Sequence, residues 1–349
     1  MNSDRYSRRT FLAAAGALAA TTVAGRAFAQ PAAYLDREDV RAFLSEMAAR
    51  NGFAPGDLEE IFAQVRFQAG VMKSMTQPPP SQKSWQSYRS IFLNNDRVSG
   101  GAAFRRDNAE ALARAAATYG VPEEVIVAII GVETKYGRLT GAYRVIDVLA
   151  TLAFDYPRRA KFFRRELEQF LLFARELGSD AFAMKGSFAG AIGLPQFMPS
   201  SYRRYAVDFD GDGRRDLFNP VDAIGSVGNF LKEHGWVSGS PIALPVQQVE
   251  GDSWRTLVDG GVLPVHSLGA LAAAGVRWSI EPVAGPLPAE TPAVLIELET
   301  PNAASTLWVG FRNFYALTRY NQSSFYAIAV VELANALRAG DFAATASAL

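Results

Sequence analysis

The sequence contains no cysteine among its 349 residues and only two histidines, His234 and His266. Without cysteine the chain has no thiol nucleophile, no disulfide framework, no thiolate metal site and no cysteine that could carry a lipid anchor. Two histidines that lie far apart in sequence also disfavour a histidine-rich metal site. These absences exclude every enzyme class that depends on a catalytic cysteine.

Neither sign of charge is in excess, because 35 lysines and arginines stand against 35 aspartates and glutamates. Such a chain has no surplus of positive charge with which to hold a phosphate backbone, so nucleic acid is not an expected partner. Hydrophobic residues make up 49% and charged residues 20%, which excludes a disordered, collagenous or coiled-coil protein. At about 150 residues per domain, the length predicts two or three domains.

Residues 1–29 have the layout of an export signal. A polar start contains Arg8 and Arg9, and an apolar, alanine-rich stretch follows over residues 11–24. The run SRRTFL resembles the twin-arginine type of signal. About 15 mildly apolar residues fall short of the roughly 20 that a membrane-spanning helix needs, so cleavage is favoured over a membrane anchor.

Ala27 and Ala29 supply the small residues that signal peptidase accepts, so we expect the mature chain to begin at Gln30. No later segment is apolar enough to span a membrane. The sequence therefore predicts a periplasmic protein without a transmembrane segment or a lipid anchor.

Apolar residues recur at helical spacing from about residue 36 to residue 177, with proline and glycine between the segments. From 238 to 312 the pattern changes to short runs rich in valine, isoleucine and leucine, which is typical of strands. Helical spacing returns between 324 and 337. The sequence therefore predicts a mainly α protein with a small β-rich insertion.

Glu133 is the strongest candidate for a catalytic group. It shares one helix face with three apolar residues, at the spacing of neighbouring turns: Ile126, Ile129 and Ile130. A carboxyl group that faces inward has a raised pKa, because desolvation disfavours its charged form, and a general acid working near neutral pH requires this. The alternative from spacing alone is a helix-end glutamate paired with Lys135, Arg138 or another cation.

Several long motifs resemble the lytic murein transglycosylase B family. They occur in the family's order and extend over nearly the whole mature chain: GVETKYG, a stretch containing YPRRA, KGSFAGAIGLPQFMPSSY, NPVDAIGSVGNF and RNFYALTRYNQSSFYA. The resemblance implies a lysozyme-like catalytic core with an additional helical region, formed by residues 30–237 and 313–349. The β-rich insertion of residues 238–312 separates these two stretches.

The resemblance also implies an activity. Enzymes of this family cleave the β-1,4 bond between N-acetylmuramic acid and N-acetylglucosamine in peptidoglycan glycan strands. The muramoyl 6-hydroxyl completes the reaction in place of water and leaves a 1,6-anhydro sugar. Glu133 occupies the position of the family's single catalytic acid and base. Most glycosidases use two carboxylates, so a mechanism with one needs help from the substrate, for which the 2-acetamido group is the candidate.

The same match assigns residues that contact the sugar. Ser187 and Gln196 are expected to hold the sugar and its acetamido group. The predicted lining of the cleft consists of Tyr88, Tyr320, Asn321 and Tyr326. Hydroxyls, amides and aromatic rings suit a ligand with hydroxyl groups and an apolar ring face. Phe230 stands where the family has tyrosine, so one hydroxyl contact is missing there. Taken singly, each residue could instead be a half-buried tyrosine or a turn serine.

The run DFDGDGRRD resembles the start of an EF-hand calcium loop. Its spacing places Asp208, Asp210 and Asp212 at loop positions 1, 3 and 5, and Gly213 at position 6. Position 12, where a bidentate glutamate is expected, is Asn219. Three clustered carboxylates repel one another unless a cation is present, so the spacing favours a bound ion.

The family resemblance implies a lengthened loop that Asp222 closes and to which Arg214 contributes its carbonyl oxygen. The expected cofactor is a structural Ca²⁺ that takes no part in the chemistry. The alternative is an Asp-Gly turn before a helix that Asn219 caps and Pro220 begins, with Asp222 stabilising the helix dipole. Both interpretations can hold together.

Two other functions remain open from the sequence. One is a non-catalytic peptidoglycan-binding periplasmic protein, which would tolerate the loss of Glu133, whereas Glu133 is present with its whole motif. The other is a plain hydrolytic muramidase, which needs the same acid and differs only in the nucleophile that reaches the anomeric carbon. The sequence predicts the lytic transglycosylase.

Overall fold

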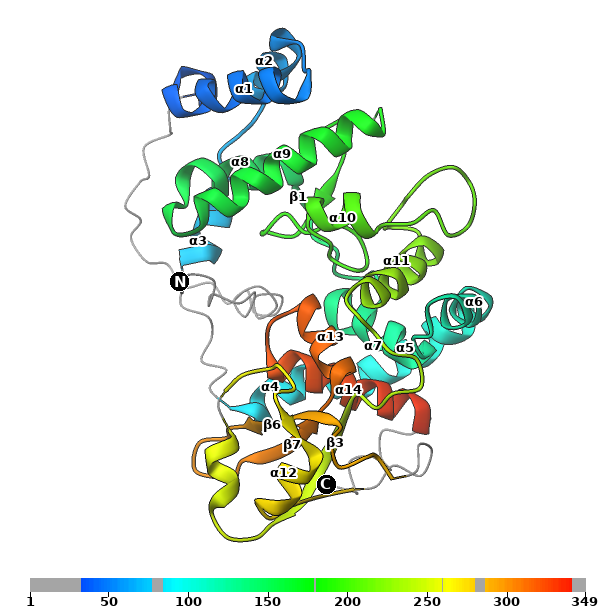
Figure 1. The fold of residues 1–349 in the computed structure, drawn as a ribbon. Helices are drawn as coiled ribbons and strands as arrows, with labels where there is room; N and C mark the ends of the chain where they lie inside the picture. Colours follow the sequence, from blue (N-terminus) through cyan, green and yellow to red (C-terminus); the bar gives the residue numbers. More distant parts are fainter. Residues whose placement is uncertain (1–32, 77–83, 179, 259, 280–285, 341–349) are drawn as a thin grey trace. The chain divides into compact units, whose positions relative to one another are not determined.

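The structure is a computed structural model that describes residues 33–76, 84–178, 180–258, 260–279 and 286–340 (Figure 1). The predicted signal of residues 1–29 lies outside the described residues. The contacts divide the chain into two compact units. Unit 1 contains the described residues of Pro80–Arg138 and Val207–Leu349, and unit 2 those of Ala13–Pro79 and Leu139–Ala206. Each unit is therefore built from separate stretches of sequence.

The helices of unit 1 surround one apolar helix. That helix is α7 (Glu123–Thr134), whose residues from Val125 to Val132 are all buried. The helices that pack against it are α5 (Asn95–Asp107), α6 (Ala109–Tyr119), α11 (Pro220–Glu233) and α14 (Ser324–Ala339). Two shorter helices of this unit, α4 (Trp85–Phe92) and α13 (Arg312–Tyr320), pack against α14.

Side-chain caps fix where several of these helices begin. The side chains of Ser84, Asn94 and Ser323 each accept a hydrogen bond from a backbone N–H in the first turn of α4, α5 and α14, respectively. Asn219 does the same for α11, where Pro220 is the first helical residue. The cap that the sequence predicted at Asn219 is confirmed.

Unit 1 also contains a five-stranded antiparallel sheet with the strand order β4-β6-β7-β3-β5. Its strands are β3 (Ala243–Val249), β4 (His266–Ser267), β5 (Val276–Trp278), β6 (Pro292–Leu298) and β7 (Thr306–Gly310). The short segments η5 (Ser253–Leu257) and α12 (Leu268–Ala273) lie between strands. Leu271, Val276, Leu295 and Val309 form part of a core cluster with Trp254 of η5. The mainly helical fold with a small β-rich part is as the sequence predicted.

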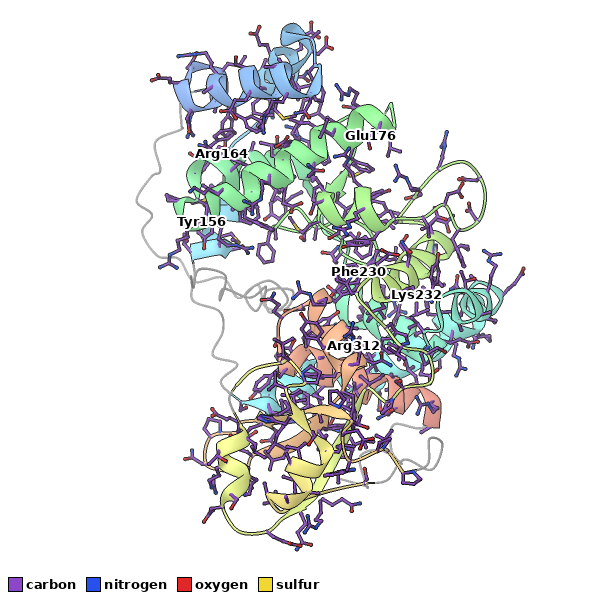
Figure 2. All side chains as sticks on the ribbon, viewed as in Figure 1. Tyr156, Arg164, Glu176, Phe230, Lys232 and Arg312 are labelled. Atoms are coloured by element: carbon purple, nitrogen blue, oxygen red, sulfur yellow. The ribbon has the colours of Figure 1, made fainter. Side chains whose placement is uncertain are left out.

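Unit 2 consists of helices and one short β ladder. Its first stretch contains η3 (Tyr34–Asp36), α1 (Glu38–Asn51), α2 (Pro55–Ala63) and α3 (Ala69–Thr76). Its second stretch contains β1 (Tyr143–Arg144), α8 (Val145–Asp155), η4 (Pro157–Arg159), α9 (Ala160–Glu176), β2 (Lys185–Gly186) and α10 (Pro199–Tyr205). Figure 2 labels Arg164 near the start of α9 and Glu176 at its end. The long helix α9 packs against α8 and α10.

A buried carboxylate joins α9 to α10. Glu166 is 5% exposed, and its carboxylate accepts hydrogen bonds from the backbone N–H of Ser200 at 2.9 Å and from the Ser200 hydroxyl at 2.8 Å. Ser200 stands in the first turn of α10, where backbone N–H groups have no partner within the helix. Glu166 therefore fixes the start of α10, just after the segment that carries Ser187 and Gln196.

Within the described ranges, no single helix is long and apolar enough to cross a membrane. Helices α6 and α7 together have the length and composition of a broken span, and the chain bends by 113° between them.

The segment around Ser187 is packed so tightly at Gly186 that no side chain fits there. A Cβ atom at Gly186 would collide with the carbonyl oxygen of Ala191 and lie 2.9 Å from Cγ2 of Val145. Because backbone cannot yield as a flexible side chain does, Gly186→Ala should lower the free energy of unfolding by about 2 kcal/mol. The matched control is Gly56→Ala in α2, where nothing lies within 4 Å of the added atom. Urea unfolding should show a lower midpoint for Gly186→Ala only, and equal midpoints would contradict this account.

Candidate active site

Glu133 lies in the last turn of α7. The helix ends at Thr134. Lys135, Tyr136 and Gly137 follow with φ values of 52°, 60° and 84°, all in the left-handed region. Their conformation ends the helix one residue after Glu133. The backbone N–H of Gly137 donates to the Thr134 hydroxyl at 3.0 Å, which holds the turn.

The apolar face of α7 does not distinguish Glu133 from other positions of the helix. Ile126, Ile129 and Ile130 are fully buried as expected, but so are Val125 and Val127 on other sides of the helix. Helix α7 is therefore buried all round, and any polar residue in it would face protein. Glu133 itself is half-buried, because it stands at the helix end.

A tyrosine hydroxyl holds the Glu133 carboxylate. The Oη atom of Tyr326, on α14, donates a hydrogen bond to Oε1 of Glu133 at 2.8 Å. Tyr326 is 0% exposed. Burial raises the pKa of Tyr326 well above its usual value, and the negative charge of Glu133 raises it further. The phenol therefore keeps its proton at neutral pH and acts as a donor.

Aromatic rings of α4, α11, α13 and α14 lie in the same unit as this pair. The rings of Tyr320, at the end of α13, and Tyr326 are nearly parallel, with centroids 6.3 Å apart. Phe230 on α11, labelled in Figure 2, meets the Tyr320 ring edge-on at 4.7 Å and stacks on His234 at 4.0 Å. Tyr88 on α4 packs against the Phe325 ring at 5.5 Å. Tyr88 and Phe325 are half-buried, so part of each ring is open to a sugar. Tyr320 and Tyr326, which the sequence placed in the lining of the cleft, are buried and present no open ring face.

Asn321 carries a buried acceptor that the described residues do not satisfy. The residue is 5% exposed, and its Oδ1 atom has no hydrogen-bond partner among the described residues. An unsatisfied buried amide oxygen is costly, and it is the kind of group that a bound hydroxyl or amide can satisfy. Unit 1 thus contains Glu133 and the four residues predicted to line the cleft: Tyr88, Tyr320, Asn321 and Tyr326.

Ser187 and Gln196 lie in unit 2, in one tightly turned segment. The Ser187 hydroxyl accepts from the backbone N–H groups of Ala189 and Ala191 at 3.3 and 3.1 Å, as a turn serine does. Gln196 has a positive φ of 52°, and its Nε2 donates to the carbonyl oxygens of Thr140 and Gly193. Local hydrogen bonds therefore fix both side chains, and a fixed side chain can present its remaining polar atoms without further loss of entropy.

The structure adds Arg97, which no spacing in the sequence indicates. Its Nη1 atom, on α5, donates to the carbonyl oxygens of Gly131 and Val132 in the last turn of α7. Burial lowers the pKa of the Arg97 guanidinium, and the negative charges of Asp96 and Glu133 oppose that shift. Arg97 lies far from Glu133 in sequence, so the contact depends on how α5 packs against α7.

The acidic loop brings three of the predicted ligands together. Single carboxylate oxygens of Asp208, Asp210 and Asp222 all lie within 4.8 Å of one another, while Asp212 does not belong to this group. Asp222 is 1% exposed and burial raises its pKa, although its oxygens accept from three backbone N–H groups: those of Phe209, Asp210 and Asp216. Asp222 therefore closes the loop before any ion binds, and it also stands in the first turn of α11.

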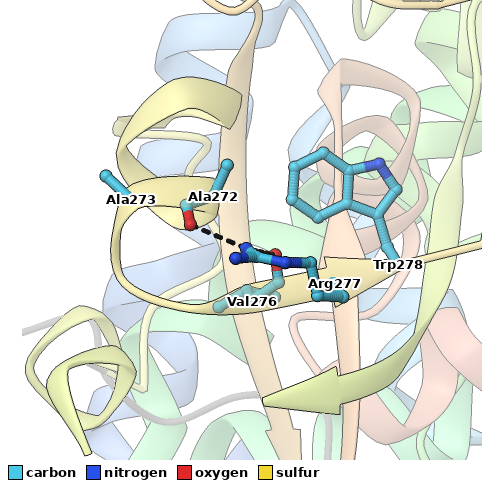
Figure 3. A pocket seen from close by; sticks show the side chains of 5 residues that line it. All are labelled: Ala272, Ala273, Val276, Arg277 and Trp278. Carbon is cyan, nitrogen blue, oxygen red and sulfur yellow. Dashed lines mark hydrogen bonds between the residues drawn. The ribbon is translucent and has the colours of Figure 1, made fainter. Parts of the chain in front are cut away.

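An open hollow of about 590 Å³ lies in the sheet region, and none of the predicted site residues line it (Figure 3). Its wall is formed by α12 and β5, through Ala272, Ala273, Val276, Arg277 and Trp278. Nη1 of Arg277 donates to the carbonyl oxygen of Ala272 at 2.8 Å, and Nη2 donates to Glu250 at 2.9 Å. The Arg277 guanidinium therefore links the last turn of α12 to Glu250, the residue that directly follows β3.

The chain belongs to the transglycosylase SLT domain family, which it matches over residues 36–335. It is 42% identical over 314 residues to the membrane-bound lytic murein transglycosylase B of Escherichia coli (strain K12), which covers 87% of this chain and 84% of that one. This match and those to solved structures confirm the predicted family, the lysozyme-like fold class and the enzyme class, a lytic transglycosylase.

Two solved structures show the similarity of fold. The catenated lytic transglycosylase SltB1 from Pseudomonas aeruginosa superposes with a TM-score of 0.81 at 46% identity, covering 87% of this chain and 98% of that chain. The Escherichia coli lytic transglycosylase Slt35 in complex with calcium superposes with a TM-score of 0.77 at 42% identity, covering 87% of this chain and 94% of that chain.

Tyr326→Phe should raise the pKa of the Glu133 carboxyl group. The variant keeps the buried ring and removes the Tyr326 hydroxyl, which donates to Oε1. A hydrogen bond to a charged group contributes about 1.5–3 kcal/mol, so its loss should shift the carboxyl pKa upward by about 1–2 units. The shift can be measured by ¹³C NMR titration, with Glu133→Gln used to assign the signal. Tyr119→Phe, on α6, is the control, and equal pKa values in both variants would contradict the assignment.

Proposed function

We propose that this peptidoglycan lytic transglycosylase uses Glu133 as its single acid and base. In the proposed reaction Glu133 gives its proton to the departing glycosidic oxygen between N-acetylmuramic acid and N-acetylglucosamine. The observation that carries the proposal is the Tyr326 hydroxyl, fully buried and 2.8 Å from Oε1, which holds the carboxylate at a helix end. The family membership and the relatives named as murein transglycosylases support the same reaction.

The second half of the proposed reaction uses the same side chain in the opposite direction. Once the glycosidic bond has broken, Glu133 is a carboxylate, which accepts the hydrogen bond from Tyr326 and can accept a proton from the muramoyl 6-hydroxyl. That oxygen then forms the new bond to C1 and leaves a 1,6-anhydromuramoyl end. The neighbouring 2-acetamido oxygen stabilises C1 between the two steps. Protons and bonds balance without a second protein carboxylate.

The substrate contacts proposed from the family resemblance fit the chemistry of these residues. The half-buried ring of Tyr88 offers a face for a sugar ring, and the buried Oδ1 of Asn321 offers an acceptor for a sugar hydroxyl or an amide N–H. Tyr320 and Tyr326 are buried, so we propose that they support the cleft from within the protein and do not present a ring face to the sugar. Ser187 and Gln196, fixed by their own turns, are proposed to hold the sugar and its acetamido group. Peptidoglycan glycan strands are thus the proposed partner.

Glu133→Gln should abolish release of anhydromuropeptides from purified sacculi. Glutamine keeps the size and shape of the side chain but cannot exchange a proton, and acid and base catalysis contributes about 10² to 10⁴ in rate. Glu123→Gln is the matched control, because Glu123 lies at the opposite end of the same helix and pairs with Arg105 at 3.1 Å. Mass spectrometry of the released muropeptides provides the measurement.

The same experiment separates the two alternative functions. A plain muramidase would release hydrated ends, one water heavier than anhydro ends, and a non-catalytic binder would release neither. Comparable release by wild type and Glu133→Gln would show that another group is the acid. Glu133→Gln should still bind sacculi in a sedimentation assay, because glutamine keeps the size and shape of the side chain and loses only the ability to exchange a proton.

We also propose that the loop of residues 208–222 binds a structural Ca²⁺. The oxygens of Asp208, Asp210 and Asp222 lie close enough to coordinate one ion, and oxygen ligands are those that calcium prefers. A relative with the same fold is known in complex with calcium. The proposal retains Asp212 and the Arg214 carbonyl as further ligands, as the spacing and the family resemblance imply. The ion would stiffen the chain before α11 without taking part in the chemistry.

Calcium should raise the melting temperature of the metal-free protein. A ligand that binds only the native state stabilises it by about 2.7 kcal/mol when its free concentration is a hundred times the dissociation constant. Asp210→Asn and Asp212→Ala should each remove most of the rise, whereas Asp252→Asn, an exposed carboxylate paired with Arg255, should retain it. Identical melting curves with calcium and with chelator would disprove the site.

The proposed location is the periplasm, reached through a cleaved signal of the twin-arginine type. The proposal rests on Arg8, Arg9 and the small residues Ala27 and Ala29. A relative named as membrane-bound acts on murein, which agrees with a place in the cell envelope.

A further inference from the structure

We infer that Arg97 is a positioning residue for Glu133: its guanidinium caps the last turn of α7 and supplies the positive charge that sets when the carboxyl group is protonated. The inference deepens the proposed function, because it rests on Glu133 being the acid. Arg97 comes from α5 and reaches the carbonyl oxygens of Gly131 and Val132. Glu133 is the next residue in that turn.

The partial negative charge at the C-terminal end of α7 disfavours a carboxylate at Glu133, and the positive charge of Arg97 counteracts it. The C-terminal end of a helix carries partial negative charge, which disfavours a carboxylate in the last turn. A guanidinium is always protonated and places its positive charge on the carbonyl oxygens from which that partial charge comes. Arg97 thus stabilises the ionised form of Glu133, which the acid must become after it has given up its proton. The attraction between the two side chains acts in the same direction.

Two contacts clamp the start of α5 to the turn after α7, and a third contact, with Phe92 of α4, holds the Arg97 side chain. Oη of Tyr136 donates to the backbone carbonyl oxygen of Arg97 at 2.7 Å. Lys135 pairs with Asp96. The Arg97 guanidinium also stands over the Phe92 ring, 5.5 Å from its centroid, and this stacking orients it. The clamp joins Asp96 and Arg97 to Lys135 and Tyr136 across two helices.

The clamp depends on two glycines. A Cβ atom at Gly101 of α5 would lie 2.5 Å from the Tyr136 hydroxyl oxygen, and one at Gly131 of α7 would lie 2.6 Å from it. The Tyr136 side chain therefore fits between the helices only because both positions lack a side chain. This packing places the Tyr136 hydroxyl beside the backbone of α5, from which Arg97 reaches α7.

The other charged and titratable groups on the helices around α7 have different roles. From α14, Tyr326 donates to Glu133 directly, Glu332 pairs with Arg89, and Arg338 pairs with Glu124. On α5, Arg105 pairs with Glu123, and Arg106 with Asp107. The remaining groups of α6 and α11 bind the acidic loop, pack on it or are exposed: Arg114, Asp222, Tyr119, Glu110, Lys232 and Glu233. Arg97 is a cation whose positive charge acts on Glu133.

The test compares neutral and charged replacements of Arg97 across a pH series. Arg97→Gln keeps a hydrogen-bond donor, and Arg97→Met keeps most of the length of the side chain. Both variants remove the positive charge. Without that charge the pKa of Glu133 should rise, so Glu133 should stay protonated to higher pH. The rate of anhydromuropeptide release falls at high pH as Glu133 loses its proton, and we call this part of the pH profile its alkaline limb. The alkaline limb should move to higher pH by about one unit in both variants. Initial rates at low sacculus concentration are proportional to kcat/KM, and the pH dependence of kcat/KM reports the pKa values of the free enzyme.

Two matched variants separate the charge from the packing. Arg97→Lys keeps the charge and loses the planar fork, so its rate should fall while its alkaline limb stays at the wild-type pH. Tyr136→Phe removes the hydrogen bond to the Arg97 carbonyl oxygen, so it should lower the melting temperature and leave the limb in place.

An unmoved limb in Arg97→Gln and Arg97→Met would overturn the inference, as would failure of both to fold while Arg97→Lys folds, because Arg97 would then serve stability alone. The Glu133→Gln assay is read separately. If Glu133→Gln remains active, the proposed function fails. If Glu133→Gln is inactive and the limb does not move, only the role of Arg97 fails.

Discussion

The end of α7 is the constraint on which the candidate site depends. The helix must stop one residue after Glu133, and it does so through three consecutive residues in the left-handed region, two of which have side chains. Such a conformation costs of order 1–3 kcal/mol for each non-glycine residue. The cost is offset by contacts that each of the two residues makes with α5: the ion pair of Lys135 and the hydrogen bond of Tyr136. Strain and its compensation thus occur at the same helix end.

Burial then decides how the polar groups near that helix end behave. Tyr326 is fully enclosed, so its hydroxyl has to find a partner, and Oε1 of Glu133 is that partner. Arg97 is bound in the same way to backbone oxygens. The hydrogen bonds of Tyr326 and Arg97 therefore stabilise the packing around the end of α7 and also orient the Glu133 carboxylate.

The sequence predicted the enzyme class and the mainly helical fold through motifs, and the physical arguments had unequal success. Periodicity identified α7 and its buried isoleucines, but it gave no position for the end of the helix, because local conformations with positive φ leave no mark on hydrophobic spacing. The cap at Asn219 was predictable, since a cap is local chemistry. The contact between Tyr326 and Glu133 follows from helix packing, which spacing does not encode, and Arg97 was missed for the same reason.

The hydrogen bond between Tyr326 and Glu133 joins residues that are 193 positions apart. A contact of such long range can form only when a long stretch of chain has been ordered, and closing that stretch costs entropy. When α7 has formed, its carboxylate still lacks the partner that α14 brings. A nascent or truncated chain without α14 therefore has an incomplete candidate site. The geometry around Glu133 is in this sense a property of the assembled unit 1 and not of α7 alone.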